Sequence, residues 1–343
     1  MTKKPANIST AVETKQKTPG QKIANKPEST VPGPFWPWLA ALLILGLLVL
    51  GIISYVTGNW LSHLSFLTSP SVQQQRITTL NIHRTLIYAD LTITVVNAQY
   101  SASFSNDEIQ AGPALARLNM QVSNKTADAI SVVYYEVARL LIPKQAPIAP
   151  TNVQLATTYP PGATATGWID FPIARDLQLS TLKLRLGSTA LNETLVLLPF
   201  SGSFNPTLYA DRISHQSLTI SYSFRGYTLT YHLNSIDIHY SYKGTQVKAG
   251  RQFYVLNFSV DNPNGVDVSP GLGFDYIRLV INGNNLPPID NTLPYDFKSG
   301  SHGIGGRVVY MAQAGMKSLT IGFLLQLVQG QDNYQVNVAL SSE

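Results

Sequence analysis

The chain has 343 residues, of which 44% are hydrophobic and only 13% are charged, about half the usual charged share of roughly 25%. It contains no cysteine, which excludes disulfide bonds, thiolate catalysis, thiol-linked lipids and metal sites built on cysteine. The net charge of +5 is concentrated in residues 1–34, which hold six lysines against two glutamates. The remainder is close to neutral and lacks the basic surface that nucleic acid binding requires, so no nucleic acid partner is expected.

Residues 1–34 are rich in Lys, Thr, Pro, Ser and Gln and have few apolar side chains to bury. Such a composition is typical of disordered segments, and we expect a disordered, Lys-rich tail. Its lysines favour contact with anionic lipid headgroups, which makes membrane lipid an expected partner. The alternative is that this tail docks a cytoplasmic partner protein.

A single membrane-spanning helix is predicted at residues 35–56. The run from Trp38 to Val56 contains no charged residue, and a helix over the whole range would be about 33 Å long, enough for a hydrocarbon core of ~30 Å. Aromatic side chains flank the run and are candidate anchors at the two membrane interfaces: Trp36, Trp38, Tyr55 and Trp60. The alternative is a cleaved signal peptide, but its apolar core is usually about 7–15 residues, so the longer run favours an uncleaved anchor.

The orientation of the predicted span follows from the lysines. The segment before it is lysine-rich, whereas residues 57–75 contain no Lys or Arg. The positive-inside rule then places the N-terminus in the cytoplasm and everything after residue 57 outside the cell membrane. We expect a single-pass membrane protein in which residues 57–75 form a stalk.

The segment after the stalk contains an internal repeat. The stretch AGPALARLNMQVSN (111–124) returns as AGRQFYVLNFSVDN (249–262), 138 residues later, with six of fourteen positions identical. Upstream, LTITVVN (91–97) aligns with LTYHLNS (229–235) at the same offset. Two copies are too few for a solenoid, so we interpret the region as two successive copies of one domain.

Hydrophobic alternation identifies the secondary structure of both copies. Leu118, Met120 and Val122 alternate with Asn119 and Gln121, a period of two that indicates a strand with one face on a core. The same pattern predicts further strands, with counterparts in the second copy, near Leu91–Val96, Val132–Leu141, Trp168–Ile173, Leu182–Leu186 and Leu195–Phe200. No convincing amphipathic helix occurs, so the predicted fold class is all-β.

Turn signals separate the predicted strands, among them PPG at 160–162 and SGSHGIGG at 299–306. Short strands separated by turns of this kind are typical of a β-sandwich. We predict two tandem β-sandwich domains, at residues 76–201 and 208–341, joined by a linker at 202–207.

Three features together resemble the telokin-like, immunoglobulin-like extracytoplasmic domains of bacterial membrane-anchored proteins of unknown function. They are the strand that ends in Asn (LNMQVSN or LNFSVDN), the segment PPGATATGWIDFPI, and the closing strand STLKLRL. The resemblance covers most of residues 90–200 and, more weakly, 229–340, where KSGSHGIGG replaces the Pro-Gly turn. It implies an immunoglobulin-like fold and an extracytoplasmic binding or scaffolding module without known catalysis.

The sequence contains one candidate cation site. The loop DNPNGVD (261–267) contains Asp261, Asn264 and Asp267, whose side-chain oxygens are ligands that Ca²⁺ prefers. The spacing departs from the known calcium-loop pattern, and Asn-Pro and Asn-Gly pairs also form turns for other reasons. The six histidines show no metal-ligand spacing and no serine-nucleophile motif occurs, so no catalytic residue and no cofactor is predicted.

Aromatic residues are concentrated in the second copy and provide a candidate ligand face: Tyr222, Tyr227, Tyr240 and Tyr242. The alternative is that they form cross-strand pairs that stabilise a sheet. The leading hypothesis is a non-enzymatic binding or adhesion module of the cell envelope, with an envelope protein or polysaccharide as partner. The alternative is an envelope sensor or assembly factor whose cytoplasmic tail contacts a partner.

Overall fold

The computed structural model describes residue 45, residues 76–106, residue 109, residues 112–324 and residues 334–341. The predicted tail, span and stalk, with the candidate anchors Trp36, Trp38, Tyr55 and Trp60, lie outside this described part. Among the described residues, no helix has the length and apolar character needed to cross a membrane.

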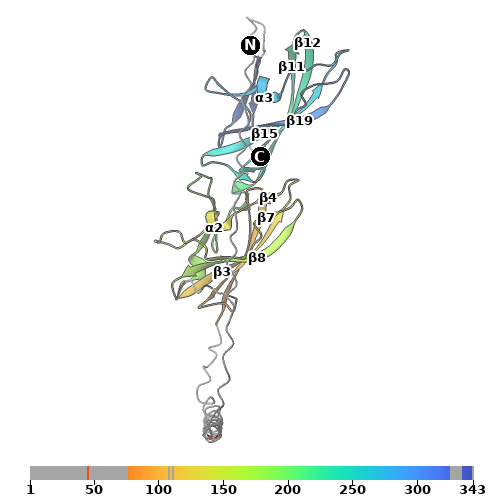
Figure 1. Cartoon of the computed structure of the whole chain (residues 1–343). Coiled ribbons are helices and arrows are strands. Elements are labelled where there is room, and N and C mark those ends of the chain that lie inside the picture. Colours follow the sequence, from red (N-terminus) through yellow and green to blue (C-terminus); the bar gives the residue numbers. More distant parts are fainter. Residues whose placement is uncertain (1–44, 46–75, 107–108, 110–111, 325–333, 342–343) are drawn as a thin grey trace, which may run out of the picture. The chain divides into compact units, whose positions relative to one another are not determined.

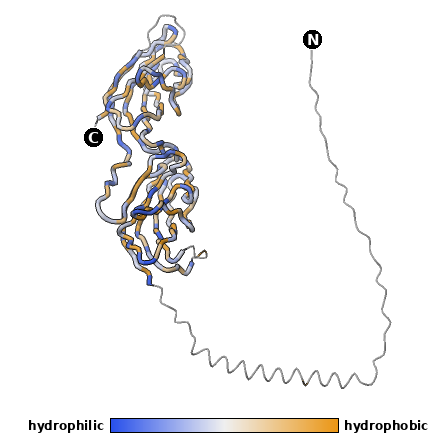
Figure 2. The backbone as a smooth tube through the Cα atoms, turned by 90° about the vertical axis from the view of Figure 1, so that its left-hand side faces the viewer, coloured by the Kyte–Doolittle hydropathy of each residue, from blue (hydrophilic) through white to orange (hydrophobic). Residues whose placement is uncertain are grey.

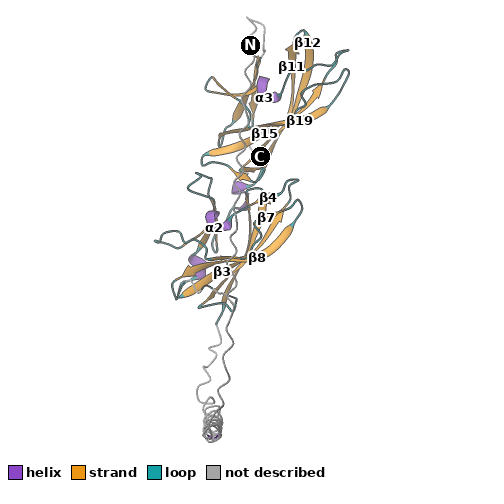
Figure 3. Cartoon of the chain, viewed as in Figure 1, coloured by secondary structure: helices purple, strands orange, loops and turns teal. Residues whose placement is uncertain are grey.

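The described part of the chain is all-β and consists mainly of antiparallel strands joined by turns and single helical turns (Figures 1 and 3). The first strand set, residues 78–199, has a five-stranded sheet in the order β1-β2-β3-β8-β6 and a three-stranded sheet in the order β10-β9-β5. The strands of these sheets are β1 (Thr78–Tyr88), β2 (Leu91–Ser101), β3 (Ala114–Asn124), β5 (Ala138–Leu141), β6 (Asn152–Val153), β8 (Thr164–Ile173), β9 (Lys183–Leu186) and β10 (Val196–Pro199). The other elements are β4 (Ile130–Ser131), which pairs with β7 (Thr158–Tyr159), and the helical turns α2 (Tyr134–Val137) and η1 (Leu179–Thr181).

The second strand set, residues 212–339, has a five-stranded sheet in the order β11-β12-β15-β19-β18 and a four-stranded sheet in the order β17-β16-β20-β21. The strands of these sheets are β11 (Arg212–Phe224), β12 (Tyr227–His239), β15 (Arg251–Asp261), β16 (Ile277–Ile281), β17 (Asn284–Leu286), β18 (Asp290–Asn291), β19 (Ile304–Gln313), β20 (Ser318–Phe323) and β21 (Tyr334–Ala339). The other elements are the hairpin of β13 (Ser241–Tyr242) and β14 (Thr245–Gln246) and the helical turns η2 (Pro206–Tyr209) and α3 (Gly273–Tyr276).

Each strand set encloses its own hydrophobic core. In β3, Leu118, Met120 and Val122 are buried while Gln121 is exposed, which confirms the alternation predicted there. In β15 the apolar row from Tyr254 to Val260 is buried in the same way. The alternation of hydrophobic and hydrophilic residues along the strands is visible in Figure 2.

The strand order of the first set recurs in the second. Strands β1, β2, β3, β8 and β6 occupy the same successive places as β11, β12, β15, β19 and β18, and β5, β9 and β10 occupy those of β16, β20 and β21. The first pair in each set also carries a register shift, between Asn81 and Arg84 in β1 and between His215 and Leu218 in β11. The repeat in the sequence therefore coincides with a repeat in strand pairing.

A buried asparagine lies at the end of β3 (Asn124) and one residue beyond the end of β15 (Asn262), and it makes the same bonds in both strand sets. Asn124 Nδ2 donates to the backbone oxygens of Asp128, Tyr159 and Pro160, at 2.7, 2.8 and 3.2 Å. Asn262 Nδ2 donates to the oxygens four, 35 and 36 residues further on, those of Val266, Phe297 and Lys298, at 2.9, 2.9 and 3.1 Å. These bonds pair carbonyl groups that would otherwise lose their hydrogen bonds on burial.

One predicted strand is corrected by the structure. The segment Val132–Leu141 is not continuous, because α2 interrupts it before β5 begins. The single helical turn allows Tyr134 to be buried with its hydroxyl group 3.0 Å from that of Tyr159. The contact between Tyr134 and Tyr159 therefore outweighs the preference of the segment Val132–Leu141 for a continuous strand.

The two strand sets differ at one buried position of the large sheet. Arg117 of β3 lies opposite Asp170 of β8 and forms a buried bidentate ion pair with it, with both N–O distances at 2.7 Å. The Arg117 guanidinium lies 4.0 Å from the Phe104 ring and 4.8 Å from the Trp168 ring. The partners at the equivalent place in the second set are two valines, Val255 and Val309.

Replacing Asn262 by Ala is expected to lower the free energy of unfolding by about 2–3 kcal/mol, because buried carbonyl groups lose their donor. Urea denaturation of the full-length chain, followed by circular dichroism, measures the loss. The control is Asn234→Ala, since Asn234 is exposed and its Nδ2 reaches only Ser259 Oγ at 3.2 Å. An equal loss in both variants would contradict the role assigned to Asn262.

Asp170→Val alone is expected to cost about 3–5 kcal/mol of stability, because it leaves the Arg117 guanidinium buried without its counter-charge. The double variant Arg117→Val/Asp170→Val, which copies the valine pair of the second set, is expected to regain at least half of that loss. Denaturant midpoints of the parent, the single variant and the double variant provide the test. If the double variant is less stable than Asp170→Val, a pair of valines cannot replace the Arg117–Asp170 ion pair, and the expectation is wrong.

Candidate functional site

A cleft of about 330 Å³ lies where loops of the first strand set meet β12, β13, β15 and β19. It is called the Tyr242 cleft below, and its lining residues are Asp90, Thr126, Ala127, Asp128, Asp211, Asp237, His239, Ser241, Tyr242, Lys243, Val255, Asn257 and Arg307. All of them belong to one compact unit, residues 74–343. The lining combines an aromatic ring, carboxylates, hydroxyl groups and cationic groups.

The β1–β2 hairpin contributes Asp90 to the cleft. Ala89 and Asp90 both have positive φ values, 50° and 61°, and Tyr88 pairs with Leu91, which is the geometry of a two-residue type I′ turn. Asp90 Oδ2 accepts a hydrogen bond from Gly244 N at 2.7 Å, and Asp90 N donates to Ser241 Oγ at 2.9 Å. The hairpin tip is therefore bonded directly to the β13–β14 hairpin that carries Tyr242.

Tyr242 is held at the cleft by a shared carboxylate. Its hydroxyl donates to Asp290 Oδ2 at 2.6 Å, and Lys243 Nζ donates to the same oxygen at 2.6 Å. Burial raises the pKa of Tyr242, and the hydrogen bond to Asp290 raises it further. Burial alone would raise the pKa of Asp290, but the bonds from Lys243 and Tyr242 outweigh it and hold that pKa below its ordinary value. The tyrosine therefore stays neutral and its ring is fixed in place.

Arg307 places a cationic group beside the Tyr242 ring. It lies on β19 opposite Asn257 of β15, with its guanidinium carbon 5.6 Å from the centre of the Tyr242 ring. Its Nε atom is buried and has no hydrogen-bond partner among the described residues. An unpaired buried donor costs free energy, so only the parts of the guanidinium other than this nitrogen can meet a ligand that enters the cleft.

A preorganised polar row lies beside Arg307. Asn257 Nδ2 donates to Asp237 Oδ2 at 2.8 Å and to Ser235 Oγ at 2.9 Å. Ser235 Oγ in turn donates to Asp237 Oδ1 at 2.9 Å. These bonds fix the orientation of the carboxylate and the amide before any ligand arrives, which lowers the entropic cost of binding.

His239 is the group in the cleft whose protonation responds to pH. Burial works to lower its pKa, but the hydrogen bond and charge of Asp211 and the charges of Asp237 and Asp90 outweigh burial and raise it. The His239 Nδ1 to Asp211 Oδ1 distance is 2.9 Å. The protonated imidazole is thus stabilised by surrounding carboxylates.

The cleft is polar and of mixed charge. It offers fixed hydrogen-bond donors and acceptors of both charge signs around a tyrosine ring, a combination that suits hydroxyl-rich ligands. Among the described residues, no three His, Asp or Glu side chains are grouped so that they could hold a metal ion.

Of the predicted ligand face, only Tyr242 lines the cleft. Tyr222 is a correction, because it is only 2% exposed and its ring stacks on Tyr276 at 5.2 Å within the core; burial raises its pKa to about 12. Tyr227 lies at the exposed β11–β12 hairpin. Tyr240 packs edge-to-face on Tyr209 with ring centres 5.5 Å apart. The alternation of apolar and polar residues in the sequence did not show which of these tyrosine rings face the core and which face solvent.

The candidate calcium ligands do not converge. Asp261 accepts from Gly303 N at 2.7 Å and lies 3.1 Å from His232 Nε2. Asp267 accepts from Ser299 N at 2.8 Å and from Lys298 Nζ at 3.0 Å. Asn264 Nδ2 donates to Thr228 O and to Asn262 Oδ1. Each side chain stabilises a different part of the loop, so the structure brings no set of calcium ligands together here.

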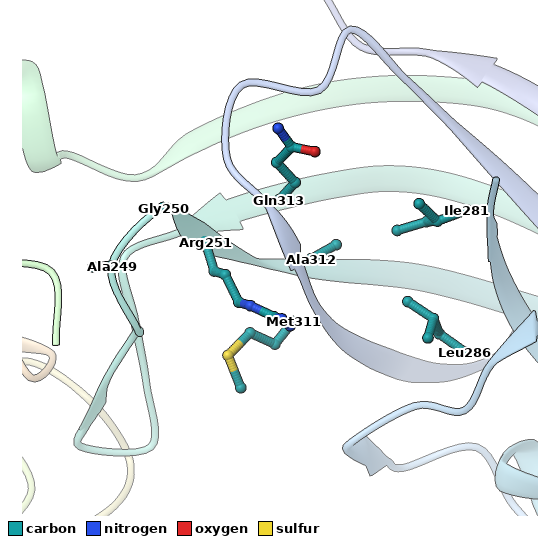
Figure 4. A pocket seen from close by; sticks show the side chains of 8 residues that line it. All are labelled: Ala249, Gly250, Arg251, Ile281, Leu286, Met311, Ala312 and Gln313. Carbon is teal, nitrogen blue, oxygen red and sulfur yellow. The ribbon is translucent and has the colours of Figure 1, made fainter. Parts of the chain in front are cut away.

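A larger hollow, of about 490 Å³, lies beside the turn that leads into β15 (Figure 4). Ile281 and Leu286 point toward Ala312 there, while Arg251 and Met311 lie next to each other. Arg251 is the one charged residue among those that line it. Because the Tyr242 cleft holds the greater number of fixed polar groups, it is the stronger candidate site.

Replacing His239 by Gln is expected to destabilise the chain more at low pH than at high pH. The folded-state pKa of His239 is raised above its ordinary value of 6.5. The stability that protonated His239 contributes to the fold is therefore fully present below pH 6.5, its unfolded-state pKa. It is lost as the pH rises through the higher folded-state pKa. Melting temperatures at about pH 5 and about pH 8.5 test this, with the exposed His215→Gln as control. A His239→Gln effect independent of pH would contradict the assigned electrostatics.

Comparisons with known proteins provide little to identify the chain. No family model matches it, and no curated protein matches it. Among solved structures, it is similar to a functionally unknown protein from Listeria monocytogenes EGD-e, with 12% identity over 36% of this chain and 87% of that chain and a TM-score of 0.29. The resemblance to telokin-like, immunoglobulin-like domains therefore stays a prediction.

Proposed function

We propose that residues 76–201 and 208–341 are two tandem immunoglobulin-like β-sandwich domains that follow a single N-terminal transmembrane helix. The repeated strand order supports the tandem arrangement. So do Asn124 and Asn262, which bond to carbonyl groups at the same sequence distances. The uncharged run at residues 35–56 and the lysines before it support the anchor.

In this proposal the chain is a non-enzymatic binding or adhesion module of the cell envelope, with its strand sets outside the membrane. Its ligand is an envelope polysaccharide that enters the Tyr242 cleft. A sugar ring offers an apolar face to an aromatic ring and hydroxyl groups to planar polar side chains. Asn257, Asp237 and Arg307 present such polar groups beside Tyr242.

The observation that carries the proposal is that Tyr242, Arg307 and Asn257 line one cleft, with the Arg307 guanidinium carbon 5.6 Å from the centre of the Tyr242 ring. The bonds within the protein already occupy Asp237 and Asp290. Among the described residues, Lys243 and His239 are each bonded to an aspartate, whereas Arg307 forms no ion pair. A neutral, hydroxyl-rich ligand accepts from it without bringing a charge that opposes the four aspartates of the lining, Asp90, Asp128, Asp211 and Asp237.

Binding of the full-length chain to an array of neutral and acidic oligosaccharides tests the proposal. Tyr242→Ala and Arg307→Gln are each expected to weaken binding by about ten-fold or more, the equivalent of about 1.4 kcal/mol. Tyr242→Ala is expected to lower the melting temperature as well, because its ring packs beside Phe253 and its hydroxyl donates to Asp290. Binding is therefore measured well below the melting temperature of each variant, with circular dichroism to confirm that it is folded.

The matched control is Tyr227→Ala, because Tyr227 is exposed and lies outside the cleft. Binding equal in all variants would remove the Tyr242 cleft as the site. Absence of glycan binding, together with capture of an envelope protein that Tyr242→Ala abolishes, would keep the cleft but replace the polysaccharide by a protein partner.

A further inference from the structure

Two arginines lie directly opposite each other on the three-stranded sheet β10-β9-β5. Arg139 of β5 pairs with Arg185 of β9, and both line a pocket of about 370 Å³. Opposite residues of an antiparallel pair have Cβ atoms about 4.5–5.5 Å apart, and like charges at that place destabilise a sheet. This arrangement calls for a compensating negative charge.

Among the described residues no carboxylate forms an ion pair with Arg185, although Glu136 lines the same pocket. Arg139 Nη1 donates to the backbone oxygens of Tyr135 and Ala138, at 2.8 and 2.7 Å. The Nε atom of Arg185, in contrast, is buried without a hydrogen-bond partner among the described residues. Burial, and next the charge of Arg139, lower the pKa of Arg185, as expected of a cation that lacks a counter-charge.

The second strand set provides an internal comparison. Arg278 of β16 is bound as Arg139 is, because its Nη1 donates to the backbone oxygens of Phe274 and Ile277, at 2.6 and 2.9 Å. The residue opposite Arg278, however, is Gly322 of β20. The second strand set therefore forms the same junction between a helical turn and a strand with one arginine instead of two.

The rest of the pocket offers hydroxyl groups and an apolar rim. Ser188 and Thr189 line it beside the arginines, and Ser188 Oγ accepts from Leu191 N at 3.3 Å, which leaves its proton free to donate. Glu136 also lines the pocket, with an exposed side chain. Leu191 is 62% exposed at the rim.

We propose that Arg139 and Arg185, with the hydroxyl groups of Ser188 and Thr189, bind a phosphate group. Two guanidinium groups present several N–H donors in fixed fork geometry, which matches the multiple acceptor oxygens of phosphate. The phosphate neutralises the opposed charges of Arg139 and Arg185 through the guanidinium groups that line the pocket. Its source is either a phospholipid headgroup or a soluble phosphate-bearing polymer. The site lies on the first strand set and does not depend on the Tyr242 cleft.

Titration of the full-length chain with inorganic phosphate, followed by ³¹P NMR line broadening, tests the proposal. Saturable binding is expected, and Arg185→Gln is expected to weaken it by at least about ten-fold, the effect of losing a charge-assisted pair of hydrogen bonds. Arg278→Gln is the matched control and is expected to bind as the parent does. A parent titration that does not saturate, or equal binding by Arg185→Gln, overturns the proposal.

Melting temperatures distinguish a variant that has lost only the phosphate site from one that no longer folds. At matched ionic strength, phosphate is expected to raise the melting temperature of the parent and of Arg278→Gln by the same amount. Arg185→Gln is expected to lose this difference, while Tyr242→Ala keeps it. A phosphate-dependent rise that persists in Arg185→Gln contradicts the proposal.

Two further ligands separate the sources of phosphate. If a short-chain phosphatidylglycerol binds about ten-fold more tightly than glycerol phosphate, and Leu191→Ser removes that gain, the ligand is a lipid headgroup whose chains contact the apolar rim. Equal affinities for the two ligands identify a soluble phosphate polymer. Both results uphold the phosphate site, and failure of both ligands to bind refutes it.

Discussion

The register of the central strands β3 and β15 is the constraint on which the rest of the structure depends. Each strand pairs antiparallel on both sides, β3 with β2 and β8 and β15 with β12 and β19. A slip by one residue would turn the buried apolar row toward solvent. The buried asparagine that ends β3 or directly follows β15 holds the next loop to this register, because its amide group bonds to carbonyl groups on two separate segments.

On this shared frame, the two strand sets differ at equivalent positions, and the candidate sites lie close to those differences. The buried Arg117–Asp170 pair of the first set is replaced by Val255 and Val309 in the second, and Val255 lines the Tyr242 cleft. The Arg139–Arg185 pair of the first set has Arg278 and Gly322 as its counterpart. A common scaffold with different side chains at matched places gives each strand set its own surface chemistry.

The two sites differ in the ligand charge that they favour. The Tyr242 cleft has four aspartates among its lining residues, which oppose an anion and favour a neutral, hydroxyl-rich ligand. The Arg139–Arg185 pocket has two opposed cations and favours an anion. The two proposals are compatible with each other, and each depends on its own residues.

The sequence by itself determined the β class, the alternation of β3 and β15, and the 138-residue repeat, since these follow from local periodicity and from matching segments. It also pointed to Tyr242, although not to its partners. Only the tertiary structure decided that Tyr222 is buried while Tyr242 lines a cleft, that α2 interrupts Val132–Leu141, and that Arg139 lies opposite Arg185. Asp90 and Gly244 are bonded although 154 residues separate them. Such contacts depend on how distant strands pair and which face each side chain takes, and a local pattern of residues carries no record of either.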